Sequence, residues 1–424
     1  MHVVILGNGI TGATAAARLR ERQPDWRITM ISGESTHPFS RPALMYIYMG
    51  HMRYKDTKLQ EDSFWPRNRI ELVRDWVVGI DVGAKRLRLH RGESIDYDKL
   101  LLAVGSKPNR FGWPGQDLDG VQGLYSLMDL KALYDATPGT NQAVIVGGGL
   151  IGIELAEMLH SRQIHTTLLV REESYWSNVL PPEESEMVNR AIRASGIELR
   201  LESELAEILD DGHGRARAAL TSKGEELPAQ IVGLTAGVSP NLDLIAETGI
   251  ECGRGVLVDA SLRTSVPDVF AAGDCAELRR SSNEPGSIQQ VWYTGKLQGA
   301  CVADVMAGDA AEYAPGQWYN SAKFLDLEYQ TYGTVLPKGQ SGLWWQDRGG
   351  TRGIRLAHDR GRLVGVNLMG VRGRHRVFEG WIDAGRTLDF ALDHLHEANF
   401  DGEFQPRFER EAIPRLRAAA GEAR

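Results

Sequence analysis

Residues 2–22, HVVILGNGITGATAAARLRER, join an apolar run to three glycines in the spacing GxGxxG. The apolar residues 3–6 predict a strand, and the Ala-, Leu- and Arg-rich stretch up to about Gln23 predicts a helix. Residues 26–31 are again strand-like. This order of strand, tight turn, helix and strand is typical of an α/β fold in which the start of the helix receives a phosphate group.

A second stretch, AVIVGGGLIGIELAEMLHSR at residues 143–162, repeats the pattern. Residues 144–146 predict a strand, the stretch to about His160 predicts a helix, and residues 166–170 predict another strand. One GxGxxG in a chain with 47 glycines is a weak signal, but two copies in the same context predict two dinucleotide sites. The repeat therefore suggests two dinucleotides that meet, a bound flavin and an exchangeable nicotinamide.

The glycines of each turn have separate expected tasks. Gly7 permits the turn, Gly9 lets backbone N–H groups approach a pyrophosphate, and Gly12 lets the helix pack closely on the strand. Glu34 stands, within a residue or two of register, where a carboxylate accepts hydrogen bonds from a ribose. The candidates near the first turn are Gly7, Gly9, Ile10, Thr11, Gly12, Gly33 and Glu34, and those of the second are Gly147, Gly149, Leu150, Ile151 and Gly152.

The composition narrows the class of protein. The 424 residues are 42% hydrophobic and 25% charged, the balance of a globular protein, and carry a formal net charge of −8. We expect no binding to nucleic acid, and no apolar run is long enough to cross a bilayer. The three cysteines, Cys252, Cys275 and Cys301, form no CxxC pair, so we expect no disulfide framework, no metal site and a cytoplasmic location.

Three further segments complete a recognisable pattern. DYDKLLLAVGSKPN (96–109) and QIVGLTAGVSPN (230–241) each run a strand into a glycine and a proline. SVPDVFAAGDCAE (265–277) delivers Gly273 and Asp274 after a strand. Together with the two glycine turns, and in this order, these segments resemble the pyridine nucleotide-disulfide oxidoreductase superfamily over about residues 1–310.

The resemblance implies FAD in the first fold and NAD(P)H in the second. It implies that Asp274 accepts hydrogen bonds from the ribityl chain of the flavin. The other cofactor contacts that it implies are Val78, Ala103, Val104, Gly105, Gly237, Gly273 and Trp292. For Trp292, an aromatic residue near the flavin, core packing is an equally good explanation.

The stretch STHPFSRPALMYIYMG (35–50) indicates the branch of the superfamily. It holds neither a CxxxxC pair nor a single cysteine, and a thiolate is required to attack a disulfide or to form a sulfenic acid. What remains resembles the ferredoxin, rubredoxin and nitrite reductases, whose Y-x-R-P-x-L segment is matched by Phe39, Arg41, Pro42 and Leu44. Met45-Tyr46 replaces the Ser-Lys pair of several members, which leaves the electron acceptor in doubt.

Two residues are the catalytic candidates. Glu154 matches a family glutamate near the nicotinamide and the flavin ring, and an exposed helix residue is the plainer interpretation. Tyr46 takes the place of the family lysine that pairs with that glutamate. Arg41 is expected to neutralise flavin or pyrophosphate charge, against the alternative of a surface arginine, and Pro42 stands where the single cysteine of the peroxidase branch would be.

The choice between NADH and NADPH depends on the end of the strand in TTLLVREES. Val170 occupies the position where an NAD site has an acidic residue, and Arg171 follows it. An arginine binds a 2′-phosphate, which favours NADPH, but Glu172 is close enough in sequence to reverse this preference.

The predicted fold class is α/β, with two Rossmann-like dinucleotide-binding domains of the three-layer ββα type and a C-terminal α+β interface domain. We expect residues 1–112 and 235–312 to form the FAD-binding domain and residues 113–234 to form the inserted NAD(P)H-binding domain. Residues 313–424 form the C-terminal domain and tail, with strands from Trp318 onward, helices at about 378–385 and after Asp389, and a tail after Pro406 that is helical or loose. The sequence leaves open whether the chain forms a homodimer.

The leading functional hypothesis is an oxidoreductase that moves hydride from NAD(P)H to FAD and passes electrons to a ferredoxin- or rubredoxin-like iron–sulfur carrier. One alternative is direct reduction of a small acceptor such as oxygen or a quinone, which Met45-Tyr46 slightly favours. Another is a redox-sensing flavoprotein with slow turnover. The run Arg372, Arg374, His375 and Arg376 either docks an acidic carrier or forms a solvated loop.

Overall fold

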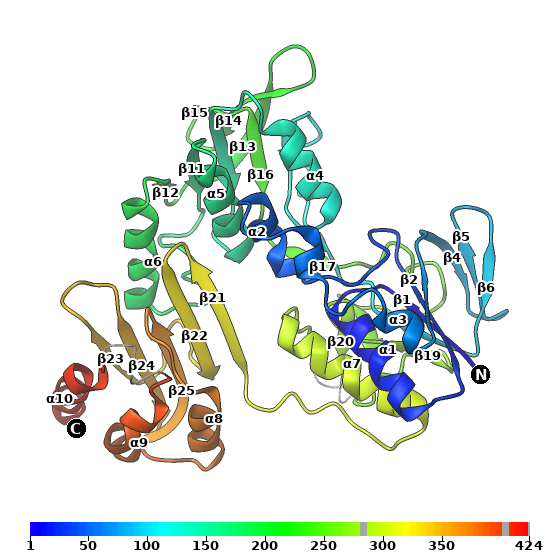
Figure 1. Cartoon of the computed structure of the whole chain (residues 1–424). Helices are drawn as coiled ribbons and strands as arrows, with labels where there is room; N and C mark the ends of the chain where they lie inside the picture. The colour runs from blue at the N-terminus through cyan, green and yellow to red at the C-terminus, as the bar shows by residue number, and fades with distance from the viewer. Residues whose placement is uncertain (280–285, 401–406, 423–424) are drawn as a thin grey trace. The chain divides into compact units, whose positions relative to one another are not determined.

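The computed structural model describes residues 1–279, 286–400 and 407–422 (Figure 1). These residues form two compact units. The first comprises Met1–Asn109, Gln122–Pro138 and Gly237–Pro315, and the second comprises Arg110–Val121, Gly139–Ala236 and Gly316–Arg424.

A parallel five-stranded sheet forms the centre of the first unit, with strand order β19-β7-β1-β2-β3. Its strands are β1 (His2–Leu6), β2 (Arg27–Ile31), β3 (Ile70–Val73), β7 (Lys99–Leu102) and β19 (Val269–Ala271). Helices α1 (Ile10–Arg22) and α7 (Trp292–Ala307) pack against each other, and Gly299 allows this because a Cβ there would lie 2.5 Å from the Thr11 carbonyl oxygen. The first glycine turn lies between the end of β1 and the start of α1, as predicted.

A small antiparallel sheet provides the remaining layer of this unit. Its strands are β4 (Val77–Asp81), β5 (Arg86–Leu89) and β6 (Ser94–Asp96). Leu87 and Leu89 are buried in the same apolar core as Val4 and Leu101 of the parallel sheet. The helix pair, the parallel sheet and the antiparallel sheet give the ββα arrangement that the sequence predicts.

Shorter elements complete the first unit. They are η1 (Arg41–Ala43), α2 (Leu44–Tyr48), η2 (Tyr54–Thr57), α3 (Phe64–Arg67), β8 (Ser106–Pro108), α4 (Leu127–Ala136), β17 (Val238–Pro240), β18 (Val256–Val258) and β20 (Ala276–Leu278). The predicted plan assigns α4 to the NAD(P)H-binding part, whereas the structure places it with the first unit. The reason is local contact, because the Tyr48 and Thr137 hydroxyls lie 2.6 Å apart and the Leu127 N–H donates to Glu34. The division into cofactor-binding domains itself stays a prediction.

The second unit contains the repeated fold. The parallel strands β12 (Glu198–Arg200), β11 (His165–Leu169), β10 (Gln142–Val146) and β16 (Ile231–Leu234) lie side by side in that order. The other elements are β9 (Val121–Gln122) at the boundary between the units, α5 (Leu150–Ser161), α6 (Pro182–Ala194) and the antiparallel strands β13 (Leu205–Asp210), β14 (Ala216–Thr221) and β15 (Glu226–Pro228). Ile208 and Ala219 of the antiparallel sheet share a core with Val144 and Val232 of the parallel sheet.

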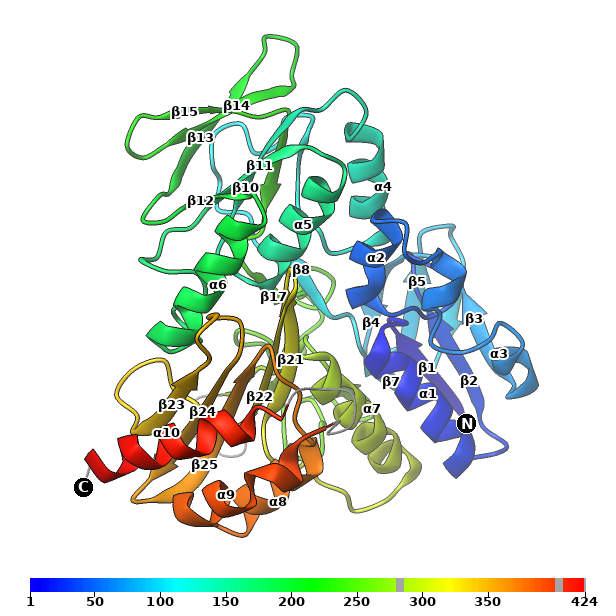
Figure 2. The same cartoon turned by 60° about the vertical axis from the view of Figure 1, so that its left-hand side comes forward.

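The C-terminal part of the second unit is an antiparallel sheet with helices, which matches the predicted α+β character. The strand order is β21-β22-β25-β24-β23, and Figure 2 shows α10 lying along this sheet, where it contacts β23. The strands are β21 (Tyr319–Phe324), β22 (Leu327–Gly333), β23 (Gly342–Gln346), β24 (Gly353–Asp359) and β25 (Arg362–Met369), and the helices are α8 (His375–Asp383), α9 (Leu388–His394), η3 (Leu395–Ala398) and α10 (Glu409–Glu422).

The tail is helical over α10, although Pro406, the predicted start of the tail, lies outside the described residues. Phe378 and Leu416 pack into one apolar core with the sheet. Over residues 1–279, 286–400 and 407–422, no helix has both the length and the apolar character needed to cross a membrane.

Candidate dinucleotide sites

At the first glycine turn, the backbone of Gly7 and Gly12 is in close contact with neighbouring backbone atoms, whereas Gly9 has free space beside it. A Cβ at Gly7 would overlap the carbonyl oxygen of Ala103, and a Cβ at Gly12 would overlap that of Gly7. A Cβ at Gly9 would meet no atom within 4 Å. Gly7 also has φ of 110°, a conformation that favours glycine. Gly7 and Gly12 are therefore required by the packing of the turn, and Gly9 faces free space.

The start of α1 has the character of an anion site. Gly9 is the N-cap and provides no side-chain hydrogen bond to the first turn of the helix. The first N–H groups of a helix have no intrahelical acceptor, and the helix dipole adds partial positive charge there. The backbone N–H groups of Ile10, Thr11 and Gly12 therefore lie at a position suited to a pyrophosphate.

The loop after β19 is held against the start of α1. A Cβ at Gly273 would lie 2.5 Å from the Thr11 hydroxyl oxygen, and the Gly273 N–H donates to Gln298 Oε1 at 2.7 Å. Asp274 follows directly, and the Ser106 hydroxyl donates to its Oδ2 at 3.2 Å. Burial raises the pKa of Asp274, while the bond from Ser106 and the charge of Arg41 oppose the rise. Asp274 is thus a partly buried carboxyl placed beside the glycine turn.

Arg41 and Glu34 form an ion pair that the sequence did not predict. Arg41 Nη2 lies 2.7 Å from Glu34 Oε2, and Nη1 lies 3.1 Å from Oε1. Arg41 also donates to the Tyr125 carbonyl, and its guanidinium carbon lies 4.7 Å from the Tyr125 ring centroid. Burial lowers the pKa of Arg41, but the bonds and charge of Glu34 outweigh it and leave the pKa above its ordinary value. Arg41 is therefore not a solvated surface arginine.

This ion pair limits what Glu34 can do for a ribose. Glu34 Oε1 accepts from both Arg41 and the Leu127 N–H, and the Glu34 side chain is only 11% exposed. Ribose binding by Glu34 stays a prediction. In the first unit its carboxylate links the end of β2 to α4.

The remaining candidates of the first unit lie on several elements. Pro42 is exposed in η1, Tyr46 on α2 is partly exposed, and Val78 on β4 is 44% exposed. Gly33 is covered by the Trp76 ring, and Trp292 begins α7 beside Tyr293. Ala103, Val104 and Gly105 follow β7, and the Gly237 carbonyl accepts from the Asn109 N–H.

Sequence reasoning missed three residues around Asp274. Ser106 lies within a quoted motif and is buried, and Gln290 Nε2 donates to its hydroxyl at 2.7 Å. The Ser106 N–H donates to the Tyr125 hydroxyl at 2.9 Å. A serine directly after the strand–glycine segment was a usable signal, whereas Tyr125 and Gln290 have no motif of their own.

The second glycine turn repeats the geometry of the first. Gly147 has φ of 130°, and a Cβ there would lie 2.6 Å from the Thr235 carbonyl oxygen. A Cβ at Gly152 would lie 2.5 Å from the Gly147 carbonyl oxygen, whereas a Cβ at Gly149 would meet no atom within 4 Å. Gly149 is the N-cap of α5, which starts with Leu150 and Ile151 and has no side-chain cap. Both turns thus combine tight first and third glycines with an open middle position.

Tyr175 supports the second turn and was not predicted. It is fully buried, and its hydroxyl donates to the Gly149 carbonyl at 2.7 Å. Its ring meets that of Phe324 of β21 edge-on, with centroids 6.4 Å apart. Burial, together with the charge of Glu154, raises the pKa of Tyr175, so this hydroxyl remains a hydrogen-bond donor.

Glu154 sits partly buried on α5, one helical turn from Glu157. Burial, reinforced by the charge of Glu157, raises the pKa of Glu154 to about 7. Glu157 Oε1 lies 2.8 Å from Lys323 Nζ of β21. Lys323 therefore forms its ion pair with Glu157. Glu154 is not the simple exposed helix residue of the alternative interpretation.

The residues after β11, where the choice between NADH and NADPH is expected to be made, are one buried residue followed by two charged ones. Val170 is fully buried, so it offers no polar group to a ribose. The Arg171 side chain is 71% exposed, and its Nη2 lies 3.0 Å from Glu172 Oε1. Arg171 is available to a ligand, with Glu172 as its partner in the structure.

The predicted basic run is partly neutralised. Arg372 forms an ion pair with Glu328 of β22, and His375 Nε2 lies 3.5 Å from Glu379 of α8. Arg376 lies 3.9 Å from the same carboxylate. Residues from His375 onward are helical, so the solvated-loop interpretation is wrong for them. The offset charge weakens the case for an acidic partner at this run.

Comparison with known proteins decides the family. Residues 1–296 match the family described as pyridine nucleotide-disulphide oxidoreductase. The chain belongs to this family. Members of this family use FAD and a nicotinamide nucleotide, which agrees with the two glycine turns of this oxidoreductase.

Individual relatives agree with this assignment. The oxidoreductase is 31% identical over 319 residues to the biphenyl dioxygenase system ferredoxin–NAD(+) reductase component of Paraburkholderia xenovorans, over 74% of this chain and 78% of the relative. It is 31% identical over 281 residues to rubredoxin-NAD(+) reductase of Pseudomonas putida, over 66% of this chain and 73% of the relative. The crystal structure of the ferredoxin reductase for the CYP199A2 system from Rhodopseudomonas palustris superposes with a TM-score of 0.80 at 26% identity, over 87% and 91% of the two chains.

The residues of this oxidoreductase fit the two cofactors that the family uses. Free space at Gly9 and Gly149, each before an uncapped helix, suits a pyrophosphate in each fold. Asp274 suits the hydroxyls of a ribityl chain, because an ionised carboxylate only accepts hydrogen bonds.

Proposed function

We propose that this chain is an FAD-dependent NAD(P)H oxidoreductase that delivers electrons to a ferredoxin- or rubredoxin-like iron–sulfur carrier. The observation that carries the proposal is the pair of glycine turns with open middle positions, because one such turn in each fold suits one dinucleotide in each. The names of two relatives, a ferredoxin–NAD(+) reductase component and a rubredoxin-NAD(+) reductase, support the class of acceptor.

The state of the cysteines supports a route that uses no protein thiol. Burial raises the pKa of Cys275 to about 11, and its Sγ lies 3.4 Å from the Leu102 carbonyl oxygen. Burial also raises the pKa of Cys252 and Cys301. A thiol with a raised pKa is a poor nucleophile, since the thiolate is the reactive form.

The residues of the first unit would hold FAD. The N–H groups at the start of α1 would bind its pyrophosphate, Asp274 its ribityl hydroxyls, and Arg41 would supply positive charge nearby. Bound FAD supplies the chemistry, since it accepts a hydride from the nicotinamide and gives up electrons one at a time. Residues 1–112 and 235–312 would be the flavin-binding domain, and residues 113–234 the nicotinamide-binding domain.

In the second unit, Glu154 would position the carboxamide of the nicotinamide. With a pKa of about 7, its carboxyl carries a proton for part of the time at neutral pH. A protonated carboxyl donates a hydrogen bond, whereas the carboxylate only accepts one. Both forms are available to the amide group of a nicotinamide, which has a donor and an acceptor.

We also propose that NADPH is the preferred nucleotide. Val170 has no polar group for a 2′-hydroxyl, and Arg171 is exposed directly after it. A guanidinium binds a phosphate through two hydrogen bonds.

Anaerobic stopped-flow reduction of the yellow protein by NADH and by NADPH, followed by mixing with candidate carriers, tests the proposal. The purified protein should reduce cytochrome c only when a ferredoxin or rubredoxin is added. Full-rate reduction without a carrier would contradict this version and favour direct reduction of a small acceptor, for which Tyr46 in place of the family lysine is the supporting observation. Reduction that stalls with every acceptor would favour a redox sensor.

A further inference from the structure

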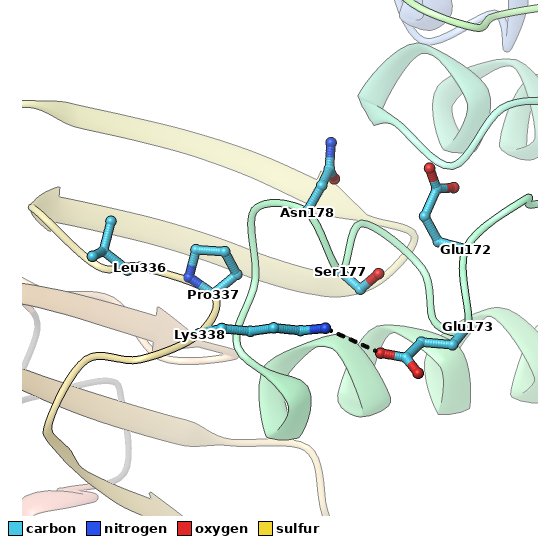
Figure 3. Close-up of a pocket in the computed structure, with 7 residues that line it drawn as sticks. All are labelled: Glu172, Glu173, Ser177, Asn178, Leu336, Pro337 and Lys338. Carbon is cyan, nitrogen blue, oxygen red and sulfur yellow. Dashed lines mark hydrogen bonds and ion pairs between the residues drawn. The ribbon is translucent and has the colours of Figure 1, made fainter.

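An open pocket of about 670 Å³ lies within the second unit, between the loop after β11 and the connection from β22 to β23 (Figure 3). Its lining residues from the nucleotide fold are Glu172, Glu173, Ser177 and Asn178, and those from the C-terminal sheet are Leu336, Pro337 and Lys338. Figure 3 shows the Lys338 side chain extended toward Glu173. The pocket is thus built by segments more than a hundred residues apart.

The pocket lies where this fold recognises the adenosine end of a nucleotide. In open α/β sheets, ligands bind beyond the carboxyl ends of the strands. The pocket begins at Glu172, three residues past the end of β11 at Leu169. In such folds the residues that follow this strand contact the ribose or its 2′-phosphate.

Each of the two glutamates that line this pocket pairs with one cation, of which Lys338 also lines the pocket and Arg171 lies next to it in the chain. Arg171 pairs with Glu172 at 3.0 Å, and Lys338 Nζ lies 3.5 Å from Glu173 Oε1. The Lys338 and Glu173 side chains are 75% and 70% exposed. Exposed ion pairs of this kind contribute little stability, so either cation can leave its partner at small cost.

We propose that Lys338, from the connection between β22 and β23, is a specificity-determining residue that joins Arg171 in binding the 2′-phosphate of NADPH. The inference rests on the proposed function and extends its nucleotide site to the C-terminal sheet. Lys338 exchanges the exposed Glu173 carboxylate for the phosphate. A phosphate monoester carries a charge of about −1.5 to −2 at pH 7, more than the single negative charge of a carboxylate, and so attracts the ammonium more strongly.

The two glutamates determine why both cations are needed. Glu172 and Glu173 repel a phosphate, and Arg171 alone, one cation against two carboxylates, would leave these side chains with a net negative charge. With Lys338 added, each carboxylate has one cation beside it and the negative charge is balanced, and the exposed Glu173 is free to turn toward solvent. A lysine suits this task, because its flexible stem lets the ammonium follow the phosphate.

The test compares ligands that differ only in the 2′-phosphate. Isothermal titration calorimetry of the FAD-loaded protein with 2′,5′-ADP and with 5′-AMP measures binding without turnover. We expect Lys338→Ala to weaken binding of 2′,5′-ADP by about tenfold, the effect of one lost hydrogen bond to a charged group. We expect binding of 5′-AMP to stay within about twofold, and Lys338→Arg to restore binding of 2′,5′-ADP.

The matched control is Lys223→Ala, which removes the charge of another exposed lysine of the same unit in the turn between β14 and β15. It should leave both affinities unchanged. Equal affinity of the unsubstituted protein for the two ligands, or an equal loss for both in Lys338→Ala, would overturn the inference. Flavin reduction by NADH would persist in that case if the proposed function holds, so the two failures are distinguishable.

Discussion

Replacing Glu154 by Gln should change how the stability of the protein depends on pH. The pKa of Glu154 is raised from 4.5 to about 7 because burial and Glu157 disfavour its charged form. The folded state therefore holds this proton more tightly than the unfolded state does, so stability falls as the pH rises from about 4.5 to about 7. Above about pH 7 the folded protein carries the full cost of the charge.

The magnitude follows from the size of the rise. A pKa about 2.5 units above the reference corresponds to about 3.4 kcal/mol, at about 1.4 kcal/mol per unit. This is a ceiling, because solvent reaches part of the Glu154 side chain. The neutral Gln has no such cost. The stability of the variant relative to the unsubstituted protein should therefore increase by up to about 2.5 kcal/mol when the pH is raised from 5 to 8.

Urea unfolding of the FAD-loaded protein at about pH 5 and about pH 8 measures this difference. Glu204→Gln is the control, because Glu204 is an exposed glutamate of the same unit. The control should give the same difference from the parent protein at both pH values. If Glu154→Gln does the same, Glu154 is ionised normally and the argument from burial is wrong.

Three further changes test the site. Gly12→Ala should abolish FAD binding, because its Cβ would overlap the Gly7 carbonyl, whereas Gly9→Ala should fold and bind FAD more weakly; flavin absorbance after gel filtration distinguishes them. Tyr175→Phe should raise the Kd for NAD(P)H several-fold, since the Gly149 carbonyl loses a hydrogen bond of about 1 kcal/mol, and an unchanged Kd would show that the turn does not need this support. Arg41→Ala should lower the free energy of unfolding by about 2 kcal/mol or more, because Glu34 would be left buried without its partner, and Arg41→Ala with Glu34→Gln should recover part of the loss.

The sequence was sufficient for the two glycine turns because their chemistry is local. A strand, a glycine with positive φ and a helix that starts without a side-chain cap lie within about twenty residues, and their spacing specifies the close contacts of Gly7 and Gly12. The same holds for the position of Asp274 after β19. These features gave the fold class and the positions of both candidate sites.

The ion pairs and the burial of the site residues could not be predicted, because they depend on partners that are distant in the chain. Nothing near Glu34 or Arg41 indicates that Leu127 and Tyr125 would meet them, so an ion pair appeared where a ribose contact was expected. Arg372 of the basic run is paired with Glu328, which is 44 residues away and becomes its neighbour only when β22 pairs with β25. Burial of Glu154 likewise depends on how α5 packs, which no motif specifies.

The contact of Phe324 with Tyr175, together with the Lys323–Glu157 pair, has a practical consequence for protein engineering. A chimera that takes its C-terminal sheet from another reductase would also exchange the support beneath the second glycine turn. Loss of nucleotide affinity in such a hybrid would therefore say little about carrier recognition unless positions 323 and 324 were transplanted back.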